Sequence, residues 1–506
     1  MKRVLKTNNL GLIKSTCSKQ GFEPKHTTAL LNTRRSITMA TTRKIYIDAN
    51  NTGLWKVKQT DESAKKASEL LQHDLETHHV YFNEKGFHNH LVHHVLSLYG
   101  TGAPSSVLQA GYDNNASYQR ARQPLHNDVV TNLIQDWSHA KAYLGKGEHY
   151  PDFLAFFQRE IDAKGWEGVL SEYVFAGTEA ADDMLVRLYA GFLHPLIQLL
   201  YGMEWKQPAI VAEALAQTCV HEPNFKEVLL ESEEKASKTY GRTTSGHGPA
   251  GADGMPRIMK LIDEVRNDEK LRGAARMDDD NKIRDGVLAR APEEMLRVIS
   301  KVKIRPEELD ERTAEMFDAS LYVAAAASFR FENKFNFFLM HHVNSSPIFL
   351  TFNAQPWIPV ETKVRLLEWK IRYDLIQYAA RGAPVLDMNE IKSYKPKDSK
   401  NTSVAGKSKP FKRPCQDLER LLGCLDVLTR LYHFEADDGH AIKLARAAVI
   451  QEALSKEYED RDWLLLKGDD VWTKIHHMIV DSVEAPGEAW SRTVASDDTW
   501  TKTQIS

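Results

Sequence analysis

The chain has 506 residues, with 66 Lys and Arg against 69 Asp and Glu and a formal net charge of −3 at pH 7. This balance excludes the basic footprint expected for binding to nucleic acid or an anionic membrane. Four widely spaced cysteines form no CxxC pair, which disfavours a disulfide framework or thiolate zinc site and fits a reducing compartment. We expect a soluble globular protein.

The N-terminus differs from the rest of the chain. Residues 1–44 carry ten Lys or Arg and a single acid, Glu23, a composition typical of a mitochondrial transit peptide. Met39 opens MATTRKI just before the first folded-looking segment, so an upstream start codon on a cytosolic protein is an equal interpretation. We expect a cytoplasmic protein, or a mitochondrial one if residues 1–38 are a transit peptide. The predicted parts are a basic N-terminal extension (1–44), a helical domain (45–485) and a C-terminal tail (486–506).

Helical periodicity dominates after residue 62, with apolar residues at three- and four-residue intervals and little two-residue alternation. Gly202 and Gly382 follow apolar runs as expected at helix ends, while Pro256 and Pro306 stand near helix starts. Two polar stretches predict mobile loops, at residues 235–254 and 393–414. The fold class is mainly α, as a single large multi-helix domain. The clearest periodic segments are 180–202, 256–273, 362–382 and 439–465.

Two sequence features narrow the chemistry. There is no GxGxxG after a strand and no GxxxxGK[ST], GxSxG or HExxH motif, so a Rossmann-type nicotinamide or flavin site has no support. The longest stretch without formal charge, residues 335–360, is broken by Asn, His and Pro and predicts protein interior, not a membrane helix. Redox chemistry would have to come from a metal or from the substrate.

Histidines crowd one segment: HHVYFNEKGFHNHLVHH, from His78 to His94, holds six of the twenty in the chain. On a helix His90 and His94 would lie one turn apart and could share a metal ion, with His93 as a competing partner. Neutral imidazole suits iron, zinc, copper or nickel. Because clustered histidines are more often exposed or satisfied in the core, this segment alone is weak evidence.

Three further histidines strengthen the case. His194, His341 and His440 each fall in a separate apolar helical segment. Burying an unsatisfied imidazole costs ~1–3 kcal/mol, so each needs a hydrogen-bond partner or a metal. Helix bundles build metal centres from side chains that project inward. Together with His90 and His94, these residues predict an interior metal site.

Lys334 lies seven residues before His341, which would place both on one helix face. Its amine could snorkel to solvent from a helix start. In an apolar pocket its pKa would fall instead, and the neutral amine could react with carbon dioxide to give a carbamate, an oxygen ligand of carboxylate type. The residues alone leave both interpretations open.

Long ordered blocks of the chain resemble the questin oxidase-like family of fungal aromatic-polyketide enzymes. The resemblance implies a mostly helical fold. It also implies oxidative cleavage of anthraquinone- or anthrone-like rings, described either as Baeyer–Villiger oxidation with NADPH or as dioxygenation at a non-haem iron. The blocks include HHVYFNEKGFHNHLVHHVLSLYGTGA (78–103), GYDNNASYQRARQP (111–124), GFLHPLIQLLYGMEW (191–205), AEALAQTCVH (212–221), NKFNFFLMHHVNSS (333–346) and EADDGHAIKLARA (435–447).

The family's iron-dependent members use several histidines and a carboxylated lysine. The resemblance assigns His90, His194, His341 and His440 as metal ligands, with Lys334 as the carboxylated lysine; His94 is added on helical geometry. His90, His341 and Lys334 would act directly in catalysis. Around the substrate we expect His79, Tyr112, Asp113 and Tyr118, although a helix-start turn at Asp113 and core packing of the tyrosines fit equally. A flat aromatic molecule would suit a pocket lined by Phe87, Trp205, Phe335 and Phe338.

The preferred expectation is an Fe(2+)-dependent dioxygenase that opens the ring of an anthraquinone-type polyketide in fungal secondary metabolism, with dioxygen as co-substrate. The chief alternative is an NADPH-dependent Baeyer–Villiger monooxygenase on a similar substrate, with NADPH as an external reductant. A third interpretation, from another class, is a non-catalytic carrier for a pigment or polyketide, in which the histidines are structural.

Overall fold

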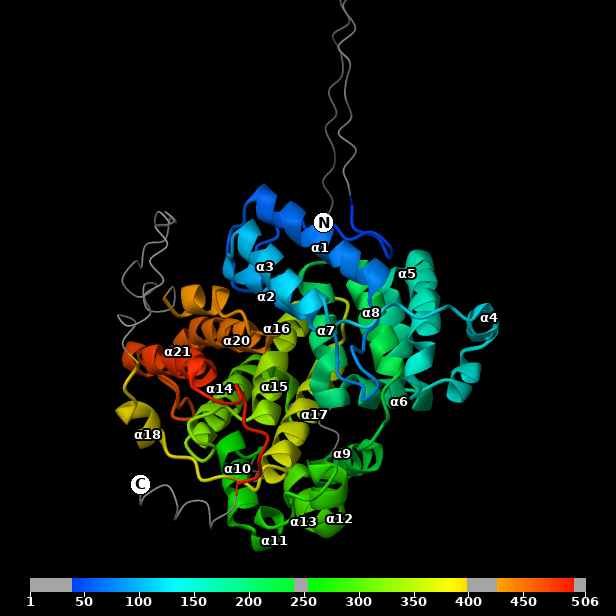
Figure 1. The fold of residues 1–506 in the computed structure, drawn as a ribbon. Helices are drawn as coiled ribbons and strands as arrows, with labels where there is room; N and C mark the ends of the chain where they lie inside the picture. Colours follow the sequence, from blue (N-terminus) through cyan, green and yellow to red (C-terminus); the bar gives the residue numbers. More distant parts are fainter. Residues whose placement is uncertain (1–38, 241–253, 398–425, 496–506) are drawn as a thin grey trace, which may run out of the picture. The chain divides into compact units, whose positions relative to one another are not determined.

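Helices account for the regular structure in the computed structural model, which describes residues 39–240, 254–397 and 426–495 (Figure 1). These residues contain no β-strand, so the prediction of a mainly α fold is confirmed. Backbone pairing of strand type is limited there to three isolated bridges: His78 with Ala121, Tyr81 with His88, and Asn336 with Ser491. From Met39 onward the chain clusters as one unit.

The helices follow one another with short connections. The α-helices are α1 (Asp61–Thr77), α2 (Leu91–Thr101), α3 (Ser105–Ala116), α4 (Asn127–Gln135), α5 (Tyr150–Tyr173), α6 (Glu179–Leu188), α7 (His194–Glu204), α8 (Pro208–Cys219), α9 (Lys226–Tyr240), α10 (Ile258–Asn267), α11 (Glu269–Arg272), α12 (Leu288–Arg290), α13 (Pro292–Ile299), α14 (Leu309–Ser328), α15 (Phe337–Ser345), α16 (Pro347–Asn353), α17 (Val360–Ala379), α18 (Met388–Ser393), α20 (His440–Ser455) and α21 (Asp469–Glu484). Shorter helical segments are Trp137–Ala142, Gly147–His149, Gly191–Leu193, Lys282–Val287, Pro306–Glu308 and Lys456–Tyr458.

Four of these helices meet in the interior although they are far apart in sequence. Every residue of α2 and α7 is buried, as expected for helices that are apolar on all sides and belong to a core. α2 packs against α7 and α20, and α15 packs against α7, α14 and α20 (Figure 1). This packing brings together the chain segments that carry His90, His194, His341 and His440.

Two predicted helix boundaries need correction. The periodic segment 180–202 is not one helix but two, α6 and α7, which meet at 63° because the chain turns between them. Gly202 lies inside α7 and does not end it. A Cβ at this position would come 2.8 Å from the Val211 nitrogen, so glycine here permits close packing of α7 on α8. Gly382 does follow a helix end, with φ of +78° just after α17.

The predicted termini and loops are partly helical or packed. Residues 39–44, predicted as extension, include buried Thr42, whose hydroxyl donates to Asp162 (2.7 Å). In the predicted tail, the Ser491 carbonyl accepts from the Phe337 nitrogen (2.8 Å). The predicted loop at 235–254 begins as the end of α9. In the predicted loop at 393–414, Ser393 ends α18 and the Tyr394 hydroxyl donates to Asp481 (2.7 Å). Residues 1–38, 241–253, 398–425 and 496–506 lie outside the described residues.

No single helix among the described residues is long and apolar enough to cross a membrane, although the bent pair Glu179–Leu188 and Gly191–Glu204 reaches that length and composition when taken together.

Candidate metal centre and its cleft

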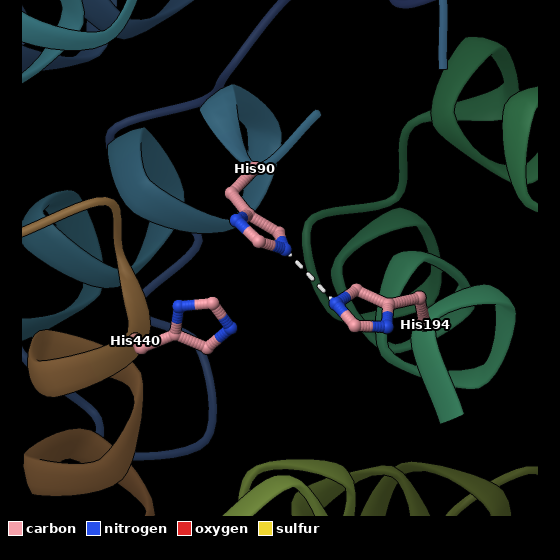
Figure 2. A group of neighbouring side chains, drawn as sticks. All are labelled: His90, His194 and His440. Carbon is pink, nitrogen blue, oxygen red and sulfur yellow. Dashed lines mark hydrogen bonds between the residues drawn. The ribbon is translucent and has the colours of Figure 1, made fainter. Parts of the chain in front are cut away.

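Four of the six predicted ligands converge in the interior. His90 immediately precedes α2, His194 opens α7, His440 opens α20, and His341 lies in the second turn of α15. All four side chains are buried. Each of His90, His194 and His440 offers a ring nitrogen within 4.8 Å of those of the other two, and Figure 2 shows these rings pointing toward one another from separate parts of the fold.

The ring nitrogens form two close pairs. Nε2 of His90 lies 2.9 Å from Nε2 of His194 (Figure 2), and Nε2 of His440 lies 3.1 Å from Nε2 of His341. Two metal–imidazole bonds of about 2.1 Å at a right angle would separate their nitrogens by about 3.0 Å. Within each pair, the observed separation therefore matches two ligands of one ion.

The opposite nitrogen of three rings faces an oxygen acceptor. Nδ1 lies 2.5 Å from the Gly191 carbonyl in His194, 2.5 Å from the Phe337 carbonyl in His341 and 2.6 Å from Oδ1 of Asp438 in His440. Because a carbonyl or carboxylate oxygen accepts only, the network assigns the proton to Nδ1 in each ring. Nε2 is then an unprotonated donor of a lone pair, the form that binds a metal.

Burial keeps these rings neutral. It lowers the pKa of His90 to about 3 and holds the pKa values of His194 and His341 well below 6.5. Burial also lowers the pKa of His440, against the opposing effect of Asp438. Two neutral rings that present lone pairs to each other at 3.1 Å cannot hydrogen bond, so this arrangement favours a cation between them.

A strained turn presents His194. Gly191, Phe192 and Leu193 have φ values of +55°, +55° and +68°. Side chains other than glycine rarely adopt this region, and such strain concentrates at functional positions. A Cβ on Gly191 would come within 2.4 Å of the His221 ring, so only glycine fits there.

Two further histidines support the centre, and the prediction of ligands omitted both. His88 stacks on His194 with ring centroids 3.8 Å apart, and its Nε2 lies 2.9 Å from Nε2 of His221. His221 is the last residue of the block AEALAQTCVH. A histidine that directly follows an apolar helix was the sequence pattern that could have identified it.

His94 does not join the cluster. Its Nδ1 lies 3.3 Å from the Asn115 amide nitrogen, and its Nε2 lies 4.0 Å from Asp437. The predicted pairing with His90 fails because His90 caps α2 with φ of −105° and ψ of 5°, so its side chain does not follow helical spacing. His93 instead stacks on Tyr201 with centroids 5.4 Å apart.

Lys334 is also placed elsewhere. Asn336 caps α15, so the helix begins at Phe337 and Lys334 does not share a helix face with His341. The Lys334 amine donates to the carbonyls of Ser482 (2.7 Å) and Ala485 (2.9 Å) at the end of α21. This is a favourable position for a lysine at a helix C-terminus.

The lysine beside the histidines is Lys443, one helical turn after His440. Its side chain is buried, and its amine lies 3.4 Å from Nδ1 of His93. Burial lowers the pKa of Lys443 to about 8, against the opposing effects of Asp438 and Asp437. In the sequence DDGHAIK, Lys443 follows His440 by three residues. This helical spacing was the pattern that could have placed the lysine beside the histidines.

A cleft of about 580 Å³ borders the cluster, with His90 and His194 in its lining. Phe87 lines it as predicted. Trp205 and Phe335 do not: the Trp205 ring packs on Tyr99 (5.1 Å between centroids), and Phe335 is fully buried. Other residues of the lining are Tyr81, Lys85, His88, Arg120, Phe192, His221 and Phe337.

The residues predicted around the substrate lie outside this lining. His79 is one layer behind it, with Nε2 3.3 Å from the carbonyl of Gly147, a lining residue. The Tyr112 hydroxyl pairs with His73 Nδ1 (2.6 Å). Asp113 is exposed and accepts from Gln109 (2.8 Å). The Tyr118 hydroxyl donates to Asn115 (2.6 Å). These contacts are structural.

An all-helical interior with converging histidines beside a cleft defines a class of helical protein with a candidate metal centre. The model of the questin oxidase-like family matches residues 87–448, and the chain belongs to this family.

Three relatives match over most of both chains. The oxidoreductase AflY of Aspergillus parasiticus is 36% identical (83% of this chain, 79% of the relative). The Baeyer-Villiger monooxygenase dmxR6 of a Cryptosporiopsis species is 34% identical (91% and 98%), and a questin oxidase of Aspergillus fumigatus is 33% identical (83% and 89%). These names make the family one of oxidoreductases.

Proposed function

We propose that this protein is an oxygenase of fungal secondary metabolism that inserts one atom of dioxygen beside a ring carbonyl of an anthraquinone-type polyketide, giving a lactone whose hydrolysis opens the ring. In this Baeyer–Villiger reaction the ring ketone, dioxygen, NADPH and a proton give a lactone, NADP+ and water. The names of the relatives support this chemistry. The structural observation that supports it best is the pair of Nε2 contacts at 2.9 and 3.1 Å among neutral histidines beside a cleft.

His90, His194, His341 and His440 would hold iron(II) through Nε2. Bound iron(II) would supply the activation of dioxygen. Asp438 accepts the Nδ1 proton of His440 and so orients that ring, and its other oxygen lies 3.7 Å from Nδ1 of His90. Such acceptors behind imidazole ligands fix the ring orientation and raise the basicity of the ligand.

Lys443, and not Lys334, is our candidate for a carboxylated lysine. A neutral amine attacks carbon dioxide to give a carbamate and release a proton, and burial favours the neutral amine. The carbamate would replace a buried cation with an anion next to the histidines. The His93 ring lies next to the Lys443 amine, and its Nε2 is buried without a hydrogen-bond partner.

The cleft suits a flat aromatic molecule. Phe87, Phe192 and Phe337 supply apolar faces. The two cations of the lining, Lys85 and Arg120, are balanced by Glu84, which lies 3.0 Å from Arg120, and by Glu148. His90 and His194 border the same space, so a ring carbonyl placed there would lie beside the histidine cluster.

A second candidate is ring cleavage by dioxygenation, in which both oxygen atoms enter the product and no NADPH is consumed. The absence of any strand in the described residues favours it, since no nucleotide-binding sheet lies in that part of the chain. A non-catalytic pigment or polyketide carrier is the third candidate, and its histidines would need no metal.

The three candidate functions can be separated by incubating the protein with an anthraquinone under isotopically labelled dioxygen and counting the labelled oxygen atoms in the product. One labelled atom per product, with consumption of one NADPH, supports the Baeyer–Villiger proposal. Two labelled atoms without NADPH would favour dioxygenation. Tight binding with no oxygen uptake, in protein reconstituted with iron(II), would leave only the carrier.

A further inference from the structure

A second hollow of about 370 Å³ shares a wall with the cleft. Gly191, Phe192, Val220 and His221 line both spaces. Another side of this hollow comes from one face of α17 and the residues just after it. Tyr373, Gln377 and Arg381 line it at four-residue spacing.

Arg381 is a buried cation with unused donors. Its side chain lies with the guanidinium carbon 4.1 Å from the centroid of the Phe338 ring, and the residue is only 3% exposed. Nε and Nη1 of Arg381 are buried without a hydrogen-bond partner, and no carboxylate among the described residues pairs with it. Burying an unpaired charge is strongly unfavourable, so this arrangement fits an anion that enters from outside the chain.

Gln377 also lines the hollow and has an unused donor of its own. Its Nε2 is buried without a partner, and the residue is 1% exposed. Three unpartnered N–H groups on adjacent turns would serve a ligand that carries acceptor oxygens. The fork of a guanidinium matches the two oxygens of a planar carboxylate.

The remaining charges of the hollow are already engaged or lie toward solvent. The Lys282 amine donates to the Met277 carbonyl (2.9 Å), and Arg492 is exposed, 3.6 Å from Glu488. Two carboxylates, Glu222 and Asp280, also belong to the lining, against three cations. Arg381 is therefore the cation whose charge is left for a ligand.

We propose that the hollow beside Arg381 and Gln377, the arginine pocket, binds the carboxylate of the ring-opened aromatic acid. This inference rests on the proposed function: insertion of oxygen gives a lactone, and water cleaves its acyl–oxygen bond to give a carboxylate, a phenol and a proton. Because Gly191, Phe192, Val220 and His221 line both spaces, the arginine pocket lies directly beside the cleft that would hold the aromatic skeleton.

Calorimetric titration of the full chain with 2-benzoylbenzoate, its methyl ester and inorganic phosphate tests the proposal. The acid should bind wild-type protein at least tenfold more tightly than the ester or phosphate. Arg381→Met should weaken the acid roughly ten- to hundredfold, the range for a charge-assisted hydrogen bond. Gln377→Met should weaken it less. Arg284→Met, the same substitution at an exposed position outside the lining, should leave the affinity unchanged.

Stability gives an independent readout. Because Arg381 is unpaired, Arg381→Met should unfold at the same temperature as wild type or higher, whereas loss of a structural arginine would lower it. Equal affinity for acid and ester, unchanged binding in Arg381→Met, or tighter binding of phosphate than of the acid would overturn the proposal. If the acid binds in a way that depends on Arg381 but the protein takes up no oxygen, the arginine pocket would be supported and the proposed oxygenase function would be wrong.

Discussion

The Nε2 atoms of His341 and His440 lie 3.1 Å apart, although Nδ1 of each ring already faces an oxygen acceptor. Neither ring has a proton to share at this contact while both are neutral. Nε2 of His90 lies 2.9 Å from Nε2 of His194, whose Nδ1 also faces an oxygen acceptor, the Gly191 carbonyl. A cation that accepts all four lone pairs would remove the repulsion, and this requirement underlies the predictions that follow.

Removal of metal should lower the stability of the folded protein. Treatment with a chelator is expected to reduce the thermal midpoint, and iron(II) should restore it, because a ligand that binds only the folded state stabilises it by about 2.7 kcal/mol at 100 times its Kd. Differential scanning calorimetry measures both steps. A midpoint indifferent to chelator and to added iron would contradict the prediction.

Lys334 and Lys443 should respond differently to substitution. Lys443→Met should remove most of the bound metal, because a carbamate can no longer form beside the histidines. Lys334→Met should retain the metal but lose roughly 1–3 kcal/mol of stability, since it leaves two helix-end carbonyls without a donor. Metal content and urea unfolding of both variants provide the comparison; metal loss in Lys334→Met alone would reverse the assignment.

The sequence predicted the fold class and the convergence of four histidines in the interior, but it predicted neither the lysine beside them nor the arginine pocket. His194, His341 and His440 were predictable because imidazoles in apolar helices need partners. His94 and Lys334 were misplaced because helical spacing assumes continuous helices, and His90 and Asn336 are caps at helix starts. The lack of a partner for Arg381 depends on which side chains surround it, and no local pattern encodes that.

Acid should destabilise the protein through its buried histidines. Burial lowers the pKa of His79 from 6.5 to about 4, so the unfolded chain binds the extra proton between these values. The contribution of His79 is fully present above pH 6.5 and falls as the pH drops toward 4, by about 2 kcal/mol between pH 7 and pH 5. His79→Gln should reduce this loss in urea titrations at the two pH values. An unchanged difference would count against neutral burial of His79.

The turn before His194 should tolerate no side chain at its first residue. Gly191→Ala places a Cβ in the left-handed region and against the His221 ring, and should cost roughly 1–3 kcal/mol. Phe192→Gly is the matched control. It relieves the left-handed backbone strain at the next residue, so it should not lower stability through backbone strain. Thermal unfolding compares the two; a stable Gly191→Ala protein would show that the turn can relax.

The most direct test of the central claim is metal analysis of protein purified without a histidine tag and reconstituted with iron(II). We predict close to one iron per chain in the wild-type protein and little in folded His341→Ala, with wild-type content in His139→Ala, an exposed histidine away from the cluster. No stoichiometric metal in the wild type, or an equal amount in His341→Ala, would contradict the proposed centre.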